Sequence, residues 1–388
     1  MRVLFLAHAY PRHAGDPVGS FVGNLAVALR DHGVQVTVSA PSAPGLAAFE
    51  EIDGVPIHRF RYAPSKYETL AYTGTMGAQV RESLAGKAAM ASYLAAAYRA
   101  SNALLRAAPF DLIHAHWWFP AGLVASVLRQ RVGMPYLVTM HGSDLRLAGS
   151  FPMGKSLYRR VATRAGAMSA VSSWLARGAE AMAPSTPVSV APMPVVPGLF
   201  SAGGTRDPDR LLFIGKLSEQ KGLHRLLRAM TQMSTRATLT VVGAGRIDDA
   251  RLKAMAVELG LEDRIEWLPL LTQQELATQY RRAAIHVVPA LDEGLGLTAV
   301  ESLLSETPVV GFASGGLPDI VLDGATGTLV PAGDENALAV ALDTLLNDPD
   351  ARRVMGAAGR DHALRLFGPD AAARRYVALY HDVMATTR

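Results

Sequence analysis

The sequence predicts an α/β protein made of two Rossmann-like domains that face a central cleft. Short apolar runs rich in Val, Leu and Ile alternate with helix-length amphipathic segments, a pattern typical of parallel strands joined by crossover helices. The pattern occurs twice along 388 residues, a length that suggests about two domains of ordinary size. A hydrophobic share of 49% supports a well-buried core in each domain.

Six strand candidates lie in each half of the chain. Those of the first half are 3–7, 36–40, 111–115, 136–140, 167–171 and 188–192. Those of the second half are 210–215, 238–243, 264–268, 285–289, 308–312 and 327–331. Residues 191–209 are rich in proline and glycine, which disfavour helix and strand, so this stretch is the expected linker. Ligands of such sheets bind beyond the carboxyl ends of the strands, so the residues that follow each strand are the candidates for chemistry.

Composition narrows the classes of partner and compartment. Basic residues exceed acidic residues by four, which favours phosphate-bearing small molecules and argues against a dedicated nucleic-acid binder. The absence of cysteine excludes disulfides, thiolate catalysis and Cys-ligated zinc, and fits the cytoplasm. The opening apolar run is too short for a signal peptide, and no apolar stretch approaches the roughly 18 residues of a spanning helix. For the basic helical region 81–108, the alternatives are a solvated face or weak peripheral contact with the inner membrane surface.

Two lysines follow the strand candidate at 210–215. Only six of the 38 basic residues are lysines, yet Lys216 and Lys221 lie within six residues of each other. Lysine presents a compact charge with three donors, and a charge-assisted bond to a phosphate oxygen contributes about 1.5–3 kcal/mol. The pair predicts a cationic pocket for phosphate, and the alternative is a solvated turn.

The stretch DEGLGLTAVE (292–301) places Glu293 and Glu301 eight positions apart across a glycine-rich turn. A structural explanation is a capping box, in which the Thr298 side chain caps the following helix and the Glu301 side chain accepts a hydrogen bond from the Thr298 amide. A functional explanation is that the two glycines expose backbone amides which, with the helix dipole, receive a diphosphate. On this stretch alone, the capping box is the simpler interpretation.

Two further glycine-bearing loops follow strand candidates. The segment GFASGGLPD (311–319) either brings backbone close to the same cleft or is only a turn. The segment 17–33 opens a helix at Gly19 and Ser20, whose amides are candidates for contact with a diphosphate. The expected apolar face of this helix consists of Phe21, Leu25, Ala28 and Leu29.

Histidines gather in the first half of the chain, where seven of the eleven precede residue 142. His114, His116 and His141 are candidates for zinc, but no further ligand pattern accompanies them, so we expect no metal. Individually, His114 and His141 are either packed histidines or functional groups at strand ends. Asp144 is a candidate to orient an acceptor hydroxyl, and the two tryptophans of HAHWW either stack on a sugar ring or pack the domain.

Taken together, these segments resemble retaining glycosyltransferases of the GT-B architecture, specifically glycosyltransferase family 4. The strongest motif, DEGLGLTAVESLLSETPVVGFASGGLPDIV (292–321), is similar to the E-x(7)-E segment of the family followed by its Pro-Val-Val and Gly-Gly pattern. Further segments resemble the family in order and spacing: GSFVGNLAVAL (19–29), TMHGSD (139–144), FIGKLSEQKGLHRLLRA (213–229) and WLPLLTQQEL (267–276).

The resemblance implies a retaining, metal-independent hexosyltransferase. Its donor would be a nucleotide-diphosphate sugar, UDP most often, with no further cofactor, and its acceptor a hydroxyl of a sugar, lipid or small metabolite. It also implies an acceptor-binding domain over 1–192, a nucleotide-sugar-binding domain over 193–366, and a final helix in 367–388 that crosses back to the N-terminal domain.

The resemblance further implies roles for individual residues. At the nucleotide it places Glu301 on the ribose hydroxyls, backbone groups around Leu271 near the base, and the diphosphate against Gly294, Leu295, Gly296, Leu297 and Thr298. Lys216 and Lys221 would neutralise the diphosphate, and Glu293 would contact hydroxyls of the donor sugar. Gly19 and Ser20 would approach from the other domain, and His141 would lie beside the anomeric region of the sugar.

Three positions depart from the family pattern. Lys216 stands where the family commonly has Arg, Asp319 where it usually has Glu, and residues 192–200 lack its Asn-Gly-Val-Asp. Two alternatives on the same scaffold are a nucleotide-sugar epimerase or phosphorylase and a non-catalytic sugar-nucleotide-binding protein. An NAD-dependent oxidoreductase is disfavoured because VVGAGRIDD (241–249) lacks the third glycine of a dinucleotide fingerprint.

Overall fold

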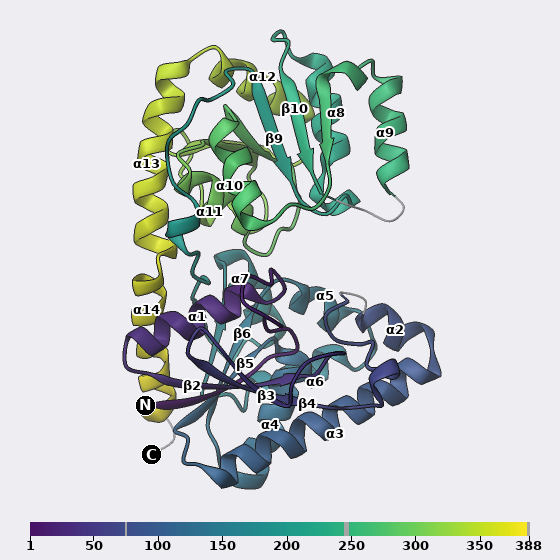
Figure 1. Cartoon of the computed structure of the whole chain (residues 1–388), viewed down its shortest axis with the longest axis vertical. Helices are drawn as coiled ribbons and strands as arrows, with labels where there is room; N and C mark the ends of the chain where they lie inside the picture. The colour runs from purple at the N-terminus through teal and green to yellow at the C-terminus, as the bar shows by residue number, and fades with distance from the viewer. Residues whose placement is uncertain (74–75, 244–247, 386–388) are drawn as a thin grey trace. The chain divides into compact units, whose positions relative to one another are not determined.

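The computed structural model describes residues 1–73, 76–243 and 248–385. Two compact units make up the chain, each built around its own sheet (Figure 1). The N-terminal unit comprises Met1–Pro194 and Pro369–Arg388, and the C-terminal unit comprises Val195–Gly368. The chain therefore passes from one unit to the other inside the predicted linker, and its last helix belongs to the N-terminal unit.

The sheet of the N-terminal unit has the strand order β3-β4-β2-β1-β5-β6-β7-β8 and is parallel except for β3. Its strands are β1 (Arg2–Leu6), β2 (Gln35–Pro41), β3 (Phe49–Ile52), β4 (Val55–Phe60), β5 (Leu112–His116), β6 (Tyr136–Met140), β7 (Ala167–Ala170) and β8 (Val188–Val190). The six predicted strands are confirmed, but the hairpin β3–β4 was missed. Asp53 and Gly54, both with positive φ, join its strands, so the Asp-Gly pair was the available signal.

Helices cover both faces of this sheet. They are α1 (Ser20–Asp31), α2 (Met76–Glu82), α3 (Leu84–Ala107), α4 (Leu123–Val132), α5 (Ser143–Gly149), α6 (Gly154–Ala162), α7 (Ser173–Met182) and α14 (Pro369–Ala385), with short helical turns η1 (Ser65–Tyr67) and η2 (Trp118–Gly122). Helix α14 packs along α1 on one face, and α3 packs beside α4 (Figure 1). Over the residues described, no helix is long and apolar enough to span a bilayer.

The basic helix predicted over 81–108 is two helices rather than one. The Ser83 hydroxyl accepts from the Gly86 amide at 2.9 Å and so begins α3 after α2 has ended. The side chains of Lys87, Arg99 and Arg106 are exposed on α3, while Met90 and Tyr93 are buried beneath it. This arrangement is the ordinary one for an amphipathic helix that covers a sheet.

The sheet of the C-terminal unit is wholly parallel, with the order β11-β10-β9-β12-β13-β14. Its strands, all six predicted, are β9 (Arg210–Ile214), β10 (Thr238–Val242), β11 (Ile265–Leu268), β12 (Ile285–Val288), β13 (Val309–Phe312) and β14 (Gly327–Val330). Its helices are α8 (Leu223–Gln232), α9 (Asp248–Glu258), α10 (Gln273–Arg282), α11 (Leu297–Leu304), α12 (Glu335–Leu346) and α13 (Pro349–Phe367), with short turns η3 (Pro197–Leu199), η4 (Glu219–Lys221), η5 (Glu262–Arg264) and η6 (Leu317–Asp319).

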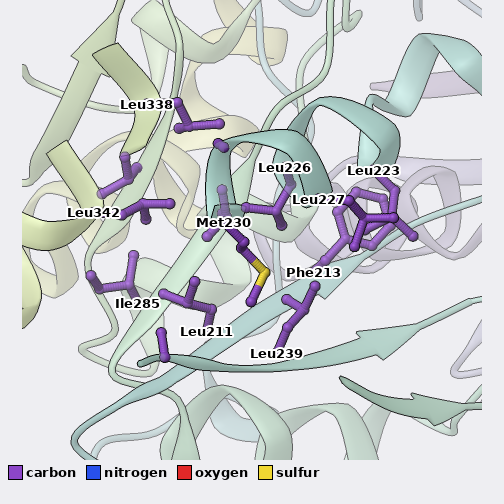
Figure 2. Packing of buried hydrophobic residues seen from close by; sticks show 14 of the residues in the cluster. Leu211, Phe213, Leu223, Leu226, Leu227, Met230, Leu239, Ile285, Leu338 and Leu342 are labelled. Carbon is purple, nitrogen blue, oxygen red and sulfur yellow. The ribbon is translucent and has the colours of Figure 1, made fainter. Parts of the chain in front are cut away.

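One face of this sheet forms the apolar core of the unit (Figure 2). Helix α8 contributes Leu223, Leu226, Leu227 and Met230, which pack against strand residues such as Leu211 and against α12. Side chains alternate along a strand, so Ile285 and Val287 of β12 belong to this core while His286, between them, points to the opposite face. The opposite face carries α10 and α11, which hold Tyr280 and Glu301.

Candidate active site

The loops after β9 and β12 pack directly against each other in the C-terminal unit. Gly222, at the start of α8, has φ 76°, and a Cβ at this position would lie 1.9 Å from the carbonyl oxygen of Pro289. Only glycine fits this approach. The Leu291 amide donates to the Gln220 carbonyl at 3.0 Å, and the Gln220 side chain donates to the Asp292 carbonyl at 3.0 Å. These contacts hold η4 beside the glycine-rich turn.

An ion pair joins the two loops. Lys221 Nζ lies 2.5 Å from Glu293 Oε2, and the side chains are 28% and 19% exposed, respectively. The aliphatic part of Lys221 passes over Gly215, which has no side chain to obstruct it. The predicted cation and the first predicted carboxylate therefore meet at one place. Lys216 lies at the end of β9 with its side chain exposed.

The glycine-rich turn is fixed from behind by the loop after β13. Gly315 has φ 61°, and a Cβ here would lie 2.3 Å from the Glu293 carbonyl oxygen and 2.5 Å from its nitrogen. The Gly316 amide donates to that carbonyl at 2.8 Å, and the Asp292 amide donates to Ser314 Oγ at 3.0 Å. The second glycine segment, 311–319, therefore supports the backbone of Glu293.

Helix α11 begins at Leu297 and carries no side-chain cap. Its N-cap residue is Gly296, in a left-handed conformation with φ 98°. The predicted capping box at Thr298 is therefore wrong, because the helix has already begun before Thr298 and the Glu301 side chain turns elsewhere. Gly294, Leu295 and Gly296 are buried and lead into the positive end of the helix dipole, which favours an anion.

Glu301 bonds to a tyrosine instead. Its Oε2 accepts from the hydroxyl of Tyr280, on α10, at 2.8 Å. Burial raises the pKa of Glu301 to about 7, against the lowering effect of this hydrogen bond. Tyr280 is fully buried, and burial followed by the nearby Glu301 charge raises its pKa well above its usual value, so the phenol stays a donor. Leu271, half-buried, lies in the segment between β11 and α10.

The N-terminal unit presents a loop that bends back onto β1. Both oxygens of the buried Asp16 carboxylate accept bonds within the loop, from Arg12 at 2.6–3.1 Å and from the Val18 amide at 3.1 Å. Gly19, with φ 75°, begins α1, and a Cβ there would lie 2.7 Å from the Ala9 carbonyl oxygen. Ser20 is the first residue of α1. Glycine at 19 thus lets the start of the helix contact the backbone of Ala9 and Tyr10, just after β1.

Three imidazoles gather at the carboxyl ends of β1, β5 and β6: His8 follows β1, His116 ends β5 and His141 follows β6. His116 Nδ1 lies 3.2 Å from His141 Nε2, and the ring of His8 lies 4.1 Å from that of Trp117, which in turn lies 4.4 Å from the ring of His141. Burial, then neighbouring imidazoles, lowers the pKa of His116 and His141 well below the usual range, and burial lowers that of His8 to about 4. All three are neutral at pH 7.

Asp144 is a structural residue rather than a group free for an acceptor. It is 1% exposed, and its carboxylate accepts from the backbone amides of His141 at 2.6 Å, Gly142 at 3.2 Å and Trp118 at 3.2 Å. Burial, opposed by these amides, raises its pKa to about 6. The carboxylate thereby ties the loop after β6, which carries His141, to the loop after β5.

His114 is also structural. Its ring is fully buried and lies 2.8 Å from the Tyr380 hydroxyl and 2.7 Å from Thr139 Oγ1. Trp117 and Trp118 pack the domain, at 8% and 0% exposure. Among the residues that the structure describes, no group of three or more His, Cys, Asp or Glu side chains is arranged to hold a metal ion.

Comparison with known proteins connects these two units to a family. The family described as "Glycosyl transferase 4-like domain" matches residues 18–194, and "Glycosyl transferases group 1" matches residues 199–362. A D-inositol 3-phosphate glycosyltransferase of Thermobispora bispora is 30% identical over 331 residues, covering 76% of each chain. The chain belongs to the family 4 glycosyltransferases of GT-B architecture.

Solved structures of other glycosyltransferases agree with this fold. Sucrose-phosphate synthase from Thermosynechococcus elongatus has a TM-score of 0.81 at 23% identity, covering 99% of both chains. Anabaena HepE in complex with UDP-glucose has a TM-score of 0.70 at 18% identity, covering 98% of this chain and 99% of that one. At these identities, the likeness concerns the fold.

Sequence reasoning missed three residues of this glycosyltransferase. Tyr280 gave no signal, because an isolated tyrosine in an amphipathic helix is ordinarily core. Nothing in the sequence distinguished His286 from an ordinary polar residue of a strand. In the structure it is fully buried, and neither ring nitrogen has a hydrogen-bond partner among the described residues. His8 was counted only among the seven histidines that precede residue 142, while the structure brings its ring against Trp117.

Proposed function

We propose that this glycosyltransferase moves a sugar from a UDP-sugar to an acceptor hydroxyl with retention of anomeric configuration, without a metal ion or further cofactor. The observation that carries the proposal is the meeting of Lys221 with Glu293 at the glycine-rich turn that opens α11. The helix N-terminus, Glu293 and Glu301 follow β12, and the cation follows β9, the neighbouring strand of the sheet. Together they offer groups for a diphosphate and for the hydroxyls of two sugars.

We assign each part of the donor to one of these groups, starting from the N-terminus of α11. The diphosphate lies at the N-terminus of the helix, against the backbone of Gly294, Leu295, Gly296, Leu297 and Thr298. Lys221, with Lys216 nearby in sequence, stabilises the charge that develops on the leaving diphosphate. Glu293 receives hydroxyls of the donor sugar, Glu301 receives those of the ribose, and backbone around Leu271 meets the base.

One argument supports a reaction without a metal ion, and another supports UDP as the donor nucleotide. Preorganised cations and backbone donors stabilise a leaving diphosphate electrostatically, which is the task a metal ion performs in other transferases. UDP is proposed as the donor nucleotide because the related HepE fold was solved with UDP-glucose. The acceptor, a hydroxyl of a sugar, lipid or small metabolite, is assigned to the N-terminal unit, where Gly19 and Ser20 follow β1 and His141 follows β6 along the chain.

Retention follows if the acceptor attacks on the face from which the diphosphate departs, with the diphosphate helping to take the proton of the hydroxyl. The anomeric configuration of the product, read from the coupling constant of its anomeric proton, tests this step. An inverted product would overturn the proposed mechanism and leave the family assignment intact.

The first prediction concerns the donor nucleotide. We expect UDP at a hundred times its dissociation constant to stabilise the C-terminal unit by about 2.7 kcal/mol. At the same concentration, GDP, ADP, dTDP and NAD should stabilise it less. In Glu301→Ala the shift should shrink, because the ribose loses its acceptor. Thermal unfolding of the purified chain measures both. A shift with NAD alone, or equal shifts in wild type and Glu301→Ala, would contradict the assignment.

The second prediction separates transfer from nucleotide binding. His141→Ala should lower the turnover number at least about 10-fold while leaving UDP affinity within about 2-fold, since His141 belongs to the other unit from the nucleotide residues. UDP release from the donor, with water as acceptor, measures turnover, and calorimetry measures affinity. The exposed His13→Ala, near the end of β1, is the control and should change neither quantity. Equal losses of turnover in the two variants would argue against a role for His141.

A further inference from the structure

Among the described residues, Tyr280 is the one side chain that is seen to hydrogen-bond to the Glu301 carboxylate. The bond occupies Oε2, at 2.8 Å, and leaves Oε1 to receive other donors. A glutamate on the first turns of a helix has three rotatable bonds, and fixing them on ligand binding costs free energy unless they are fixed beforehand. An anchored carboxylate therefore binds a diol more tightly than a mobile one.

Tyr280 itself is held firmly. Its ring is fully buried, 5.8 Å from the ring of Phe200 and 5.4 Å from that of His286, both at near-perpendicular angles. Its backbone carbonyl accepts from Thr307 Oγ1 at 2.7 Å. These contacts hold the Tyr280 ring and backbone in place, so the tyrosine is a rigid donor rather than a side chain that follows Glu301.

We propose that Tyr280 is a positioning residue of the nucleotide site, whose hydroxyl holds the Glu301 carboxylate in the orientation that receives the 2′ and 3′ hydroxyls of the ribose. The inference rests on the proposed function, because it takes Glu301 as the ribose acceptor. Tyr280 does not touch the nucleotide; it acts through Glu301.

The surroundings of Glu301 make its binding of the ribose hydroxyls dependent on pH. From α10 it meets Tyr280, which stays protonated, and across Tyr280 lies His286 of β12, whose pKa burial and Lys221 lower to about 3. From α13, Arg360 donates to the carbonyls of Leu304 and Phe200. Ribose hydroxyls donate to the ionised carboxylate, so binding is strongest above the raised pKa of Glu301, near 7, and weakens as pH falls through it.

The test compares UDP with 2′,3′-dideoxy-UDP by calorimetry on the full chain. Both nucleotides carry the same diphosphate, so the ratio of their affinities isolates the ribose hydroxyls and cancels the titration of the diphosphate. At pH 8 we expect Tyr280→Phe to weaken UDP about 5-fold and dideoxy-UDP less than 2-fold. We also expect the pH at which the ratio falls to half to move upward, because Tyr280→Phe removes the bond that favours the carboxylate.

Tyr376→Phe is the matched control. Tyr376 is also fully buried, and its hydroxyl donates to the Ala191 carbonyl at 2.7 Å in the N-terminal unit. This variant loses a buried hydroxyl without touching Glu301, so its ratio and pH profile should match wild type. If Tyr280→Phe does not fold, Tyr280→Met replaces it, since the flexible thioether side chain also lacks the hydroxyl and leaves Glu301 itself unchanged.

The outcomes distinguish the inference from the proposed function. Loss of the ratio in both Glu301→Ala and Tyr280→Phe, or in both Glu301→Ala and Tyr280→Met where Tyr280→Phe does not fold, supports positioning. Loss in Glu301→Ala alone, with wild-type ratio and pH profile in the Tyr280 variant, overturns positioning and leaves the donor site standing. A ratio unchanged in Glu301→Ala overturns the ribose assignment and, with it, the inference.

Discussion

Replacing Lys221 by alanine should lower kcat/KM at least about 100-fold, a loss of roughly 3 kcal/mol in transition-state stabilisation. The substitution removes the cation that the structure holds at the glycine-rich turn, and it leaves the Glu293 carboxylate, 19% exposed, without its partner at 2.5 Å. UDP release from the donor sugar measures the loss. Lys253→Ala is the control, because this exposed lysine of α9 lies over the Trp267 ring and should change kcat/KM less than about 2-fold.

A double variant decides what Lys221 does. If the lysine serves only to neutralise Glu293, then Lys221→Ala combined with Glu293→Gln should recover stability and reach the turnover of Glu293→Gln alone, since no unpaired charge remains. If Lys221 acts on the diphosphate, stability should recover while turnover stays well below that of Glu293→Gln alone. Lys221→Arg keeps the charge on a longer, planar group, so it should retain part of the turnover. Turnover in Lys221→Ala within about 3-fold of wild type would contradict both roles.

The regular part of the fold follows from the sequence because hydrophobic patterning reports burial directly. All twelve strand candidates are strands of the two sheets, since strands covered on both faces are apolar throughout. The hairpin β3–β4 escaped because "FEEI" carries two acidic residues in a strand with exposed positions, so its pattern resembles a loop. The edge position of β3 explains this pattern, and edges are not visible in a single sequence.

The site was predictable to the level of residue type and strand end, but not to the level of partners. Lys221 and Glu293 were both singled out, yet only the structure shows that they form one ion pair. Glu301 was expected in a capping box on local grounds, and its actual partner, Tyr280, lies 21 residues earlier on another helix. Local rules weigh nearby residues, so they miss a bond that depends on how α10 and α11 pack.

Replacing Gly315 by alanine should destabilise the C-terminal unit by at least about 3 kcal/mol. A left-handed conformation costs a non-glycine residue roughly 1 kcal/mol, and the added Cβ would meet the Glu293 backbone at 2.3 Å and 2.5 Å, closer than any real contact. The backbone of Glu293 must move, so UDP affinity should fall with stability. Denaturant unfolding of the transition that UDP shifts measures the first effect, and calorimetry the second.

Gly333→Ala separates strain from displacement. Gly333 belongs to the same unit and has φ 81°, but a Cβ there meets nothing within 4 Å. It should therefore cost only the conformational term of about 1 kcal/mol and leave UDP affinity unchanged. The difference between the two variants measures how firmly the loop after β13 fixes Glu293. Equal destabilisation, with equal UDP affinity, would mean that Glu293 is held from elsewhere and that 311–319 is only a turn.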